Sequence, residues 1–371
     1  MTELTRGDAT AEVRRIMTIC NACRYCEGLC ATFQAMTFRR DFAAGDLDYL
    51  ANLCHSCTAC YHDCQYSPPH EFEVNVPRTL ADLRLESWER YAWPGFLARA
   101  FQKNGLLVSM LTAIALIVVL VVATALIEGD VLYGVHTGPG AFYAVVSHGV
   151  MVAVAGTTFT FSLIAIVISV FRFMRSSDNE SPRRDAGSAW LTALGNAGTL
   201  KYLDGGHGDG CSSRDDGASN KRRIYHQLTM WGFLLCFAAT SVATVYDYVL
   251  GWVAPYPFFS LPVLLGTVGG LGLLIGPAGL FYEKIRSDRA AMQPSQFGMD
   301  YAFIGLLFLV SLTGLVLLAF RETAAMGLLL VVHLGFVLAL FVALPYSKFV
   351  HGAYRLAAMR RFAEERRSQK A

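Results

Sequence analysis

Residues 20–30 read CNACRYCEGLC and residues 54–64 read CHSCTACYHDC, and these two runs decide how the rest of the chain is interpreted. Both have the spacing C-x2-C-x2-C-x3-C, and together they hold eight of the ten cysteines. Structural zinc sites usually join two C-x2-C pairs across a longer gap, and three successive short intervals do not suit one tetrahedral ion. Disulfides need an oxidising compartment, which the topology predicted below excludes. The runs therefore indicate thiolate ligands of iron–sulfur clusters.

The doubled spacing resembles that of bacterial two-cluster ferredoxins, in which the fourth cysteine of each run ligates the other cluster. This resemblance implies one [4Fe–4S] cluster on Cys20, Cys23, Cys26 and Cys64, and a second on Cys54, Cys57, Cys60 and Cys30. Between the runs, residues 31–53 carry apolar side chains at mixed helical spacing, which favours helices over a βαβ arrangement. We expect an α-helical ferredoxin-like domain in residues 1–100.

The composition places the remainder of the chain in lipid. Of the 371 residues, 54% are hydrophobic and only 16% are charged, whereas soluble proteins carry about 25% charged residues. Six apolar stretches have the length of roughly 20 residues that a membrane-crossing helix needs. They are residues 106–127, 141–173, 224–250, 258–282, 301–320 and 324–346. The sequence thus predicts a mainly α chain whose residues 101–351 form a six-helix transmembrane bundle.

Basic residues are concentrated in alternate loops. The loop 174–223 and the basic tail 352–371 belong to one set, whereas the opposite set contains a single basic residue, Arg321. The positive-inside rule places the basic set, both termini and the cysteine runs in the cytoplasm. No apolar signal segment precedes residue 15. We expect a multi-pass protein of the bacterial cytoplasmic (inner) membrane.

Histidines inside predicted spans are candidate cofactor ligands, because ionisable residues are rare there. His333 and His351 are eighteen residues apart, which is five helical turns, or about 27 Å. Haem needs an axial nitrogen on each face, so the simplest pairing is His226 with His351 and His148 with His333. Arg222, Arg223, Lys348 and Arg355 flank the former pair, where haem propionates need cations. Each histidine could instead be a hydrogen-bonded packing residue, and His136 could replace His148.

The last predicted span resembles the final helix of the respiratory nitrate reductase gamma subunit, which binds two b-type haems with histidines at this same interval. That resemblance implies haem b between His226 and His351. The family's outer ligand lies ten residues after the position of His226, where this chain has Cys236. One haem b is therefore expected, and a second requires His148 in place of the missing ligand.

Almost the whole chain resembles the tricarballylate/citrate utilization protein B family. The resemblance is carried by LCHSC at 53–57, PPHEF at 68–72, GFLLCFAAT at 232–240, APYP at 254–257 and GPAGL at 276–280. Its members are taken to reoxidise the reduced flavin of a soluble FAD-dependent dehydrogenase and to pass the electrons to the membrane quinone pool. The resemblance implies that role here, with the lipid bilayer and quinone as further partners.

We therefore expect an electron-transfer subunit of an oxidoreductase complex. It carries no catalytic residues and no substrate-dehydrogenase site of its own, because no nucleotide fingerprint is present, and nucleic acid is not an expected partner. Two other classes remain open at this stage. A redox sensor would have labile clusters that quinone does not reoxidise. A transporter with a metal-binding head would need acidic residues at mid-span, whereas Asp247, Glu283 and Asp300 lie near span ends.

Overall fold

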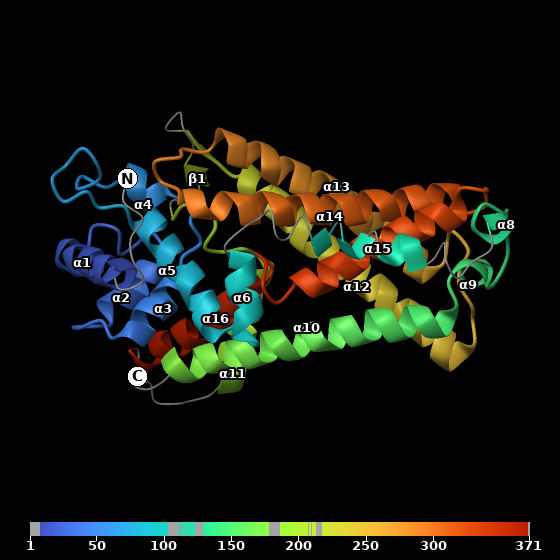
Figure 1. Cartoon of the computed structure of the whole chain (residues 1–371). Coiled ribbons are helices and arrows are strands. Elements are labelled where there is room, and N and C mark those ends of the chain that lie inside the picture. The colour runs from blue at the N-terminus through green and yellow to red at the C-terminus, as the bar shows by residue number, and fades with distance from the viewer. Residues whose placement is uncertain are drawn as a thin grey trace.

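The computed structural model describes residues 8–102, 111–112, 114–116, 118–122, 129–177, 186–206, 208, 210–212 and 217–369. Helices make up most of these residues, which confirms the predicted mainly α fold. Short helices gather at one end of the molecule, and long helices extend from there toward the opposite end (Figure 1). Helix α16 at the C-terminus lies among the short helices near the N-terminus, so both ends of the chain are at the same end of the molecule.

The short helices hold the cysteine runs, and we call α1–α5 the head. They are α1 (Asp8–Cys23), α2 (Ala31–Thr37), α3 (Ala44–Leu53), α4 (Ala59–His62) and α5 (Val76–Tyr91). The first run begins in α1 and ends at Cys30, directly before α2. The second run begins at Cys54, directly after α3, and continues through α4. Helix ends, rather than strands, therefore position the cysteines.

Helix α5 connects the head to the membrane helices. Its first turn contains Pro77, and the side chain of Asn75 accepts a hydrogen bond from the Arg78 N–H at 3.3 Å. Both features favour the start of a helix at this point. The buried side chains of Leu80 and Leu83 face α1 and α3. A short helix, α6 (Gly95–Gln102), follows.

Five helices of the described chain are long and apolar enough to cross a membrane. They are α10 (His148–Ser177), α12 (Lys221–Leu250), α13 (Leu261–Arg286), α14 (Phe297–Phe320) with the 3-10 turn Pro294–Gln296 before it, and α15 (Met326–Ala343). Helices α12 to α15 correspond to the last four predicted spans. These helices are consistent with a membrane protein.

The first two predicted spans differ in detail from the structure. The stretch predicted as one span at 141–173 is divided, because α9 (Ala141–Val145) ends before α10 begins at His148. A further short helix, α8 (Gly129–Leu132), precedes α9. The span predicted at 106–127 lies largely outside the described residues. Its described residues, 111–112, 114–116 and 118–122, are helical.

Helices α12 and α13 pack very closely because glycines form their contact. A Cβ atom added to Gly232 would lie 2.8 Å from the Gly269 carbonyl oxygen, and one added to Gly276 would lie 2.7 Å from the Thr229 backbone nitrogen. Small residues at such positions let helix backbones approach each other and gain van der Waals contact in lipid. This close contact fixes the position of α12, the helix that carries His226.

The C-terminal residues predicted only as a basic tail form helix α16 (Val350–Ser368), which packs on the head. A buried ion cluster joins them. Arg361 contacts Asp46 of α3 at 2.8 Å and Glu365 at 2.9 Å, and Arg39 contacts the same Asp46 at 2.8 Å and Glu365 at 2.5 Å. The Tyr49 hydroxyl also donates to Glu365 at 3.1 Å. Buried charges paired in this way tie α16 to the loop after α2 and to α3.

The loop predicted at 174–223 also packs on the head. It contains helix α11 (Ala186–Gly198), which lies against α16, and the antiparallel pair β1 (Cys211–Ser212) and β2 (Ala218–Ser219). Gly206 has φ +86°, and a Cβ atom there would lie 2.4 Å from the carbonyl oxygen of Leu29. A glycine is needed at this position because any side chain would collide with the first cysteine run.

Candidate functional site

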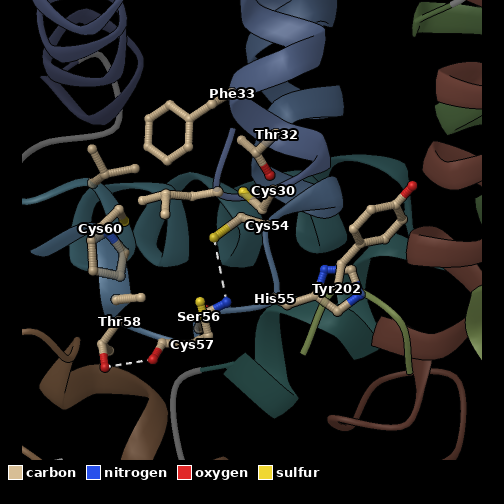
Figure 2. Close-up of a pocket in the computed structure, with 14 residues that line it drawn as sticks. Cys30, Thr32, Phe33, Cys54, His55, Ser56, Cys57, Thr58, Cys60 and Tyr202 are labelled. Carbon is tan, nitrogen blue, oxygen red and sulfur yellow. Dashed lines mark hydrogen bonds between the residues drawn. The ribbon is translucent and has the colours of Figure 1, made fainter. Parts of the chain in front are cut away.

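One pocket of the head is lined by Cys30, Cys54, Cys57 and Cys60 (Figure 2). We call it the proximal pocket, because it is the one beside the membrane helices. Cys30 comes from the start of α2, Cys54 from the end of α3, and Cys60 from α4. These four residues are one of the two ligand sets implied by the sequence.

A second pocket, which we call the distal pocket, is lined by Cys20, Cys23, Cys26 and Cys64. These are the four cysteines of the other implied ligand set. Phe33 lines both pockets, so its ring lies between the two groups of sulfur atoms. The structure thus brings together each set of four cysteines, with the fourth cysteine of each run placed beside the other run.

The arrangement of the cysteines suits a group larger than a single metal ion. Within the described part of the chain, no three cysteine, histidine or carboxylate side chains converge as ligands of one ion. A [4Fe–4S] cube instead takes one thiolate at each of four separated iron corners. Four cysteines around one pocket therefore fit a cube better than zinc.

When no metal is bound, burial and the close spacing of the cysteines disfavour the thiolate form of these side chains. Burial, together with the neighbouring Cys26 and Cys64, raises the pKa of Cys20 to about 12. Burial and the neighbouring Cys54 raise the pKa of Cys30 to about 11, against backbone hydrogen bonds that lower it. Bound iron supplies the positive charge that makes several close thiolates stable, so cluster assembly in these pockets would release protons.

Strained backbone surrounds Cys57. Ser56 has φ +52° and Thr58 has φ +66°, and both lie in the left-handed region that β-branched residues such as threonine avoid. Such residues cost about 1–3 kcal/mol each and persist where the surrounding structure fixes them, commonly at functional sites. Here the strain turns the chain so that Cys54, Cys57 and Cys60 all line one pocket.

Three arginines from different helices hold the loop that begins at Cys54. Arg84 of α5 donates to the carbonyl oxygens of Ala51 at 2.7 Å and Cys54 at 2.8 Å. Arg355 of α16 donates to the same Cys54 carbonyl at 2.8 Å. Arg222 of α12 donates to the Ser56 carbonyl at 2.6 Å. The proximal pocket is therefore clamped between the head, the first turn of a membrane helix and the C-terminal helix.

His226 and His351 lie face to edge at the head end of the membrane helices, with ring centroids 5.9 Å apart and ring planes at 84°. A metal–imidazole bond is about 2.0 Å long, so two imidazoles on opposite sides of one metal have ring centres roughly 6 Å apart. The Nδ1 atom of His351 is hydrogen-bonded to the Lys348 carbonyl, which leaves Nε2 for a metal. His226 Nδ1 is buried without a hydrogen-bond partner among the described residues. This predicted pair is brought together, and the two imidazoles are the residues that would hold a haem iron at this place.

His55 lies between the proximal pocket and the histidine pair. Its ring lines the pocket and contacts Tyr202 at a centroid distance of 5.9 Å (Figure 2). Its Nδ1 atom is hydrogen-bonded to the Leu53 carbonyl at 2.9 Å. Burial lowers the pKa of His55 well below its usual value, and the neighbouring Arg355, Arg84 and His226 lower it further. His55 is therefore neutral.

The structure does not pair His148 with His333. His148 contacts Asp247 at 3.0 Å and packs against the ring of Tyr143. His333 Nδ1 is hydrogen-bonded to the Thr313 hydroxyl at 3.1 Å.

Two other positions bear on an outer ligand. His136 Nε2 is hydrogen-bonded to the Val131 carbonyl at 2.6 Å. Cys236, at the position of the outer ligand in the nitrate reductase subunit, faces Gly269 of α13. Each candidate for an outer haem ligand therefore has a separate partner within the protein.

The sequence analysis missed the residues around the proximal pocket. It expected Arg222, Arg223, Lys348 and Arg355 to flank a haem, but Arg222 and Arg355 bind the Cys54 loop and Arg223 donates to the Thr199 carbonyl at 2.9 Å. Lys348 pairs with Asp300 at 3.0 Å. Arg84 could have been noticed as a charge among the apolar positions of α5, but its partner is a loop 30 residues earlier in the chain.

Comparisons with known proteins agree with this arrangement. A family model described as "Citrate utilization protein B Fer4-like domain" matches residues 13–90, and one described as "Citrate utilization protein B" matches residues 99–371. A protein of Escherichia coli named "Citrate utilization protein B" is 48% identical over 360 residues, which cover 97% of this chain and 93% of that protein. No solved structure matches.

The Fer4-like match indicates that the head binds iron–sulfur clusters, which fits a role in electron transfer. Because the match extends over nearly the full length of the chain, and both family models agree with it, the chain belongs to the citrate utilization protein B family.

Proposed function

We propose that this protein is a membrane-anchored electron-transfer subunit. It takes electrons from the reduced flavin of a soluble partner dehydrogenase of the tricarballylate- or citrate-utilization type and delivers them to the quinone pool. The observation that carries the proposal is a pair of four-cysteine pockets that share Phe33, together with a pair of histidines at the head end of the membrane helices. The clusters and the haem would supply one-electron carriers, and the chain's own residues hold them in sequence.

Each of the two pockets would hold one [4Fe–4S] cluster. Cys20, Cys23, Cys26 and Cys64 would ligate the distal cluster, and Cys30, Cys54, Cys57 and Cys60 the proximal one. The crossed position of the fourth cysteines supports this assignment, because it is the pattern of two-cluster ferredoxins. The domain of residues 1–100 is thus proposed to provide the soluble electron-entry end.

His226 and His351 would ligate one haem b. The ring separation of 5.9 Å and the unpartnered Nδ1 atom of His226 support this proposal. A second haem on His148 and His333 has less support, because those residues contact Asp247 and Thr313 instead. We therefore propose a single haem at the head end of the bundle.

The basic loops support a cytoplasmic head in the bacterial inner membrane, with both termini in the cytoplasm. This orientation would put the distal pocket where a soluble flavoprotein can reach it and would keep the thiols reduced. Quinone would accept electrons within the bilayer. Hydride chemistry on the organic substrate belongs to the partner.

Reduction and reoxidation of the purified full-length protein test the proposal. The protein, prepared without oxygen, is reduced with dithionite in detergent, the excess reductant is removed, and a water-soluble quinone is added. The iron–sulfur absorbance and a b-type α-band should both return to the oxidised form. Clusters that are present but are not reoxidised by the quinone would contradict the proposed electron acceptor and favour a redox sensor.

A further inference from the structure

The proximal pocket is surrounded by arginines that have no carboxylate partner. Arg84, Arg222 and Arg355 all donate to backbone carbonyls of the Cys54 loop or of α3. Within the described ranges, none of the three makes an ion pair with an aspartate or glutamate. Arg84 is only 2% exposed. Burying a charge without an opposite charge is costly, so a nearby anion would stabilise these three arginines.

The arginines also act on one another. Arg84 and Arg355 both donate to the Cys54 carbonyl, so their two guanidinium groups lie close together. The Nε atom of Arg355 is buried and has no hydrogen-bond partner among the described residues. The nearest carboxylate of the membrane domain, Asp300, is already held by Lys284 at 2.5 Å and Lys348 at 3.0 Å. Arg222 also contacts the Cys211 sulfur at 4.0 Å. The Cys54 loop, which Arg84, Arg222 and Arg355 all contact, places the group held by the four cysteines beside all three arginines.

The distal pocket has the opposite surroundings. Asp63 is one of its lining residues and directly precedes the ligand candidate Cys64 in the sequence. No carboxylate lines the proximal pocket, and neither wall contains an arginine among the described residues. Reduction adds an electron, and hence a negative charge, to a cluster that is already anionic with four thiolates. Positive charge favours that step and negative charge opposes it.

We infer that Arg84, Arg222 and Arg355 raise the reduction potential of the cluster in the proximal pocket and thereby favour electron flow from the distal pocket toward the membrane. This inference rests on the proposed function, because it requires a cluster in each pocket. The step is a one-electron exchange in which no covalent bond changes. Burial acts in the opposite direction, since a cluster in apolar surroundings is harder to charge. The inference is therefore tested by changing residues of one pocket rather than by comparing the two pockets.

The test is a redox titration of the full-length protein followed by electron paramagnetic resonance, with iron counted in each sample. Arg222→Gln and Arg355→Gln remove one charge each and keep a hydrogen-bond donor. Arg222→Lys and Arg355→Lys keep the charge and lose the fork-shaped donor. The matched control is Arg223→Gln, which removes a charge one residue further along α12 from a side chain directed at Thr199.

Each glutamine variant should lower the midpoint potential of one cluster. The ratio of oxidised to reduced cluster at a fixed potential should then change at least about tenfold, which corresponds to about 59 mV for one electron. The midpoint potential of the other cluster should change much less. In the lysine variants and in Arg223→Gln, both midpoint potentials should stay close to those of the wild type. Unchanged midpoints in glutamine variants with a full iron complement would overturn the inference. So would lysine variants that shift as far as the glutamine variants, because geometry rather than charge would then be responsible. Wild-type protein without iron would instead refute the proposed function.

If Arg355→Gln loses the iron of one cluster, the inference is tested on Arg222→Gln alone. In that variant Arg84 and Arg355 are unchanged and still donate to the Cys54 carbonyl. A midpoint in Arg222→Gln equal to that of the wild type would then count against the inference.

Discussion

The two cysteine pockets have the same ligand chemistry but different surroundings. The distal pocket opens toward the surface: Cys23 is exposed, and Tyr25 beside it is 73% exposed. The proximal pocket is enclosed by α5, α12 and α16, whose arginines bind its loop. Identical cysteine spacing thus produces one site that a soluble partner can approach and one that is built into the membrane domain.

Under the proposed function, the direction of electron flow would depend on the residues around the cysteines and not on the cysteine motif. The motif determines which atoms can bind iron. Exposure and nearby charge distinguish the two pockets, because Cys23 is exposed in the distal pocket and three arginines bind the loop of the proximal pocket.

The largest expected effect is the loss of haem from His351→Ala. The histidine pair is next to the proximal pocket, so removal of one axial ligand should abolish the b-type α-band and leave about eight non-haem irons per chain. Difference spectra and an iron assay measure both quantities. The matched control is His333→Ala, which should keep the band. A normal α-band in His351→Ala would contradict the ligand assignment.

The next effect concerns the helix that closes the proximal pocket. Glu365→Gln removes a buried charge that contacts Arg39 at 2.5 Å and Arg361 at 2.9 Å. Leaving buried charges without a partner costs about 3 kcal/mol, and the loss should loosen α16 from α3 and expose the Cys54 loop. The melting temperature followed by cluster absorbance should fall.

Glu12→Gln is the control, because Glu12 pairs with Arg15 at 2.6 Å on the exposed side of α1. Its effect on the melting temperature should be much smaller. Equal melting temperatures for the two variants would show that the ion cluster between α16 and the head does not hold the proximal pocket closed.

A smaller effect is a difference in the rate of cluster loss. Exposure of Cys23 should let ferricyanide attack the distal cluster first, so that about four of the eight irons leave in a fast phase. The Cys23→Ala variant should lack that phase, and Cys57→Ala should retain it. The reverse pattern would mean that the proximal pocket is the more accessible one.

The smallest effect is a pH dependence at the junction of α5 with the membrane domain. Burial raises the pKa of Asp82 to about 6, although a hydrogen bond from Gln293 lowers it. The folded state therefore binds a proton more tightly than the unfolded state, and stability falls as the pH rises from about 4 through 6.

Asp82→Asn should remove this cost at pH 8, with a gain below about 1 kcal/mol because solvent screens the group. Thermal unfolding at several pH values measures it. The gain should vanish at pH 4, and the same gain at both pH values would exclude ionisation of Asp82 as its cause.

Much of this architecture could be predicted from the sequence. The resemblance of the cysteine spacing to two-cluster ferredoxins implied the two ligand sets whose members line separate pockets. His226 was paired with His351 because both were predicted at the cytoplasmic side of their spans, and the structure brings these two rings together. These predictions depended on the local spacing of residues and on helical periodicity, both of which can be read directly from the sequence. The long apolar stretches likewise located α12 to α15.

The unpredicted features depend on contacts between distant segments. Arg355 reaches the Cys54 carbonyl across 301 residues, and Arg222 reaches Ser56 across 166. Residues 352–371 were interpreted as a basic tail because their charge is evident in the sequence, whereas the buried partners Asp46 and Glu365 are not. His148 was paired with His333 by depth alone, and the structure gives each a different neighbour.

The measurement that tests the central claim most directly is the iron content of two double variants. If each pocket holds one cluster, Cys30→Ala with Cys57→Ala removes two ligands from the proximal pocket and should leave about four irons per chain. Cys30→Ala with Cys23→Ala removes one ligand from each pocket and should leave almost none. The opposite result, four irons in the second variant and none in the first, would show that each cysteine run holds its own cluster and would contradict the account.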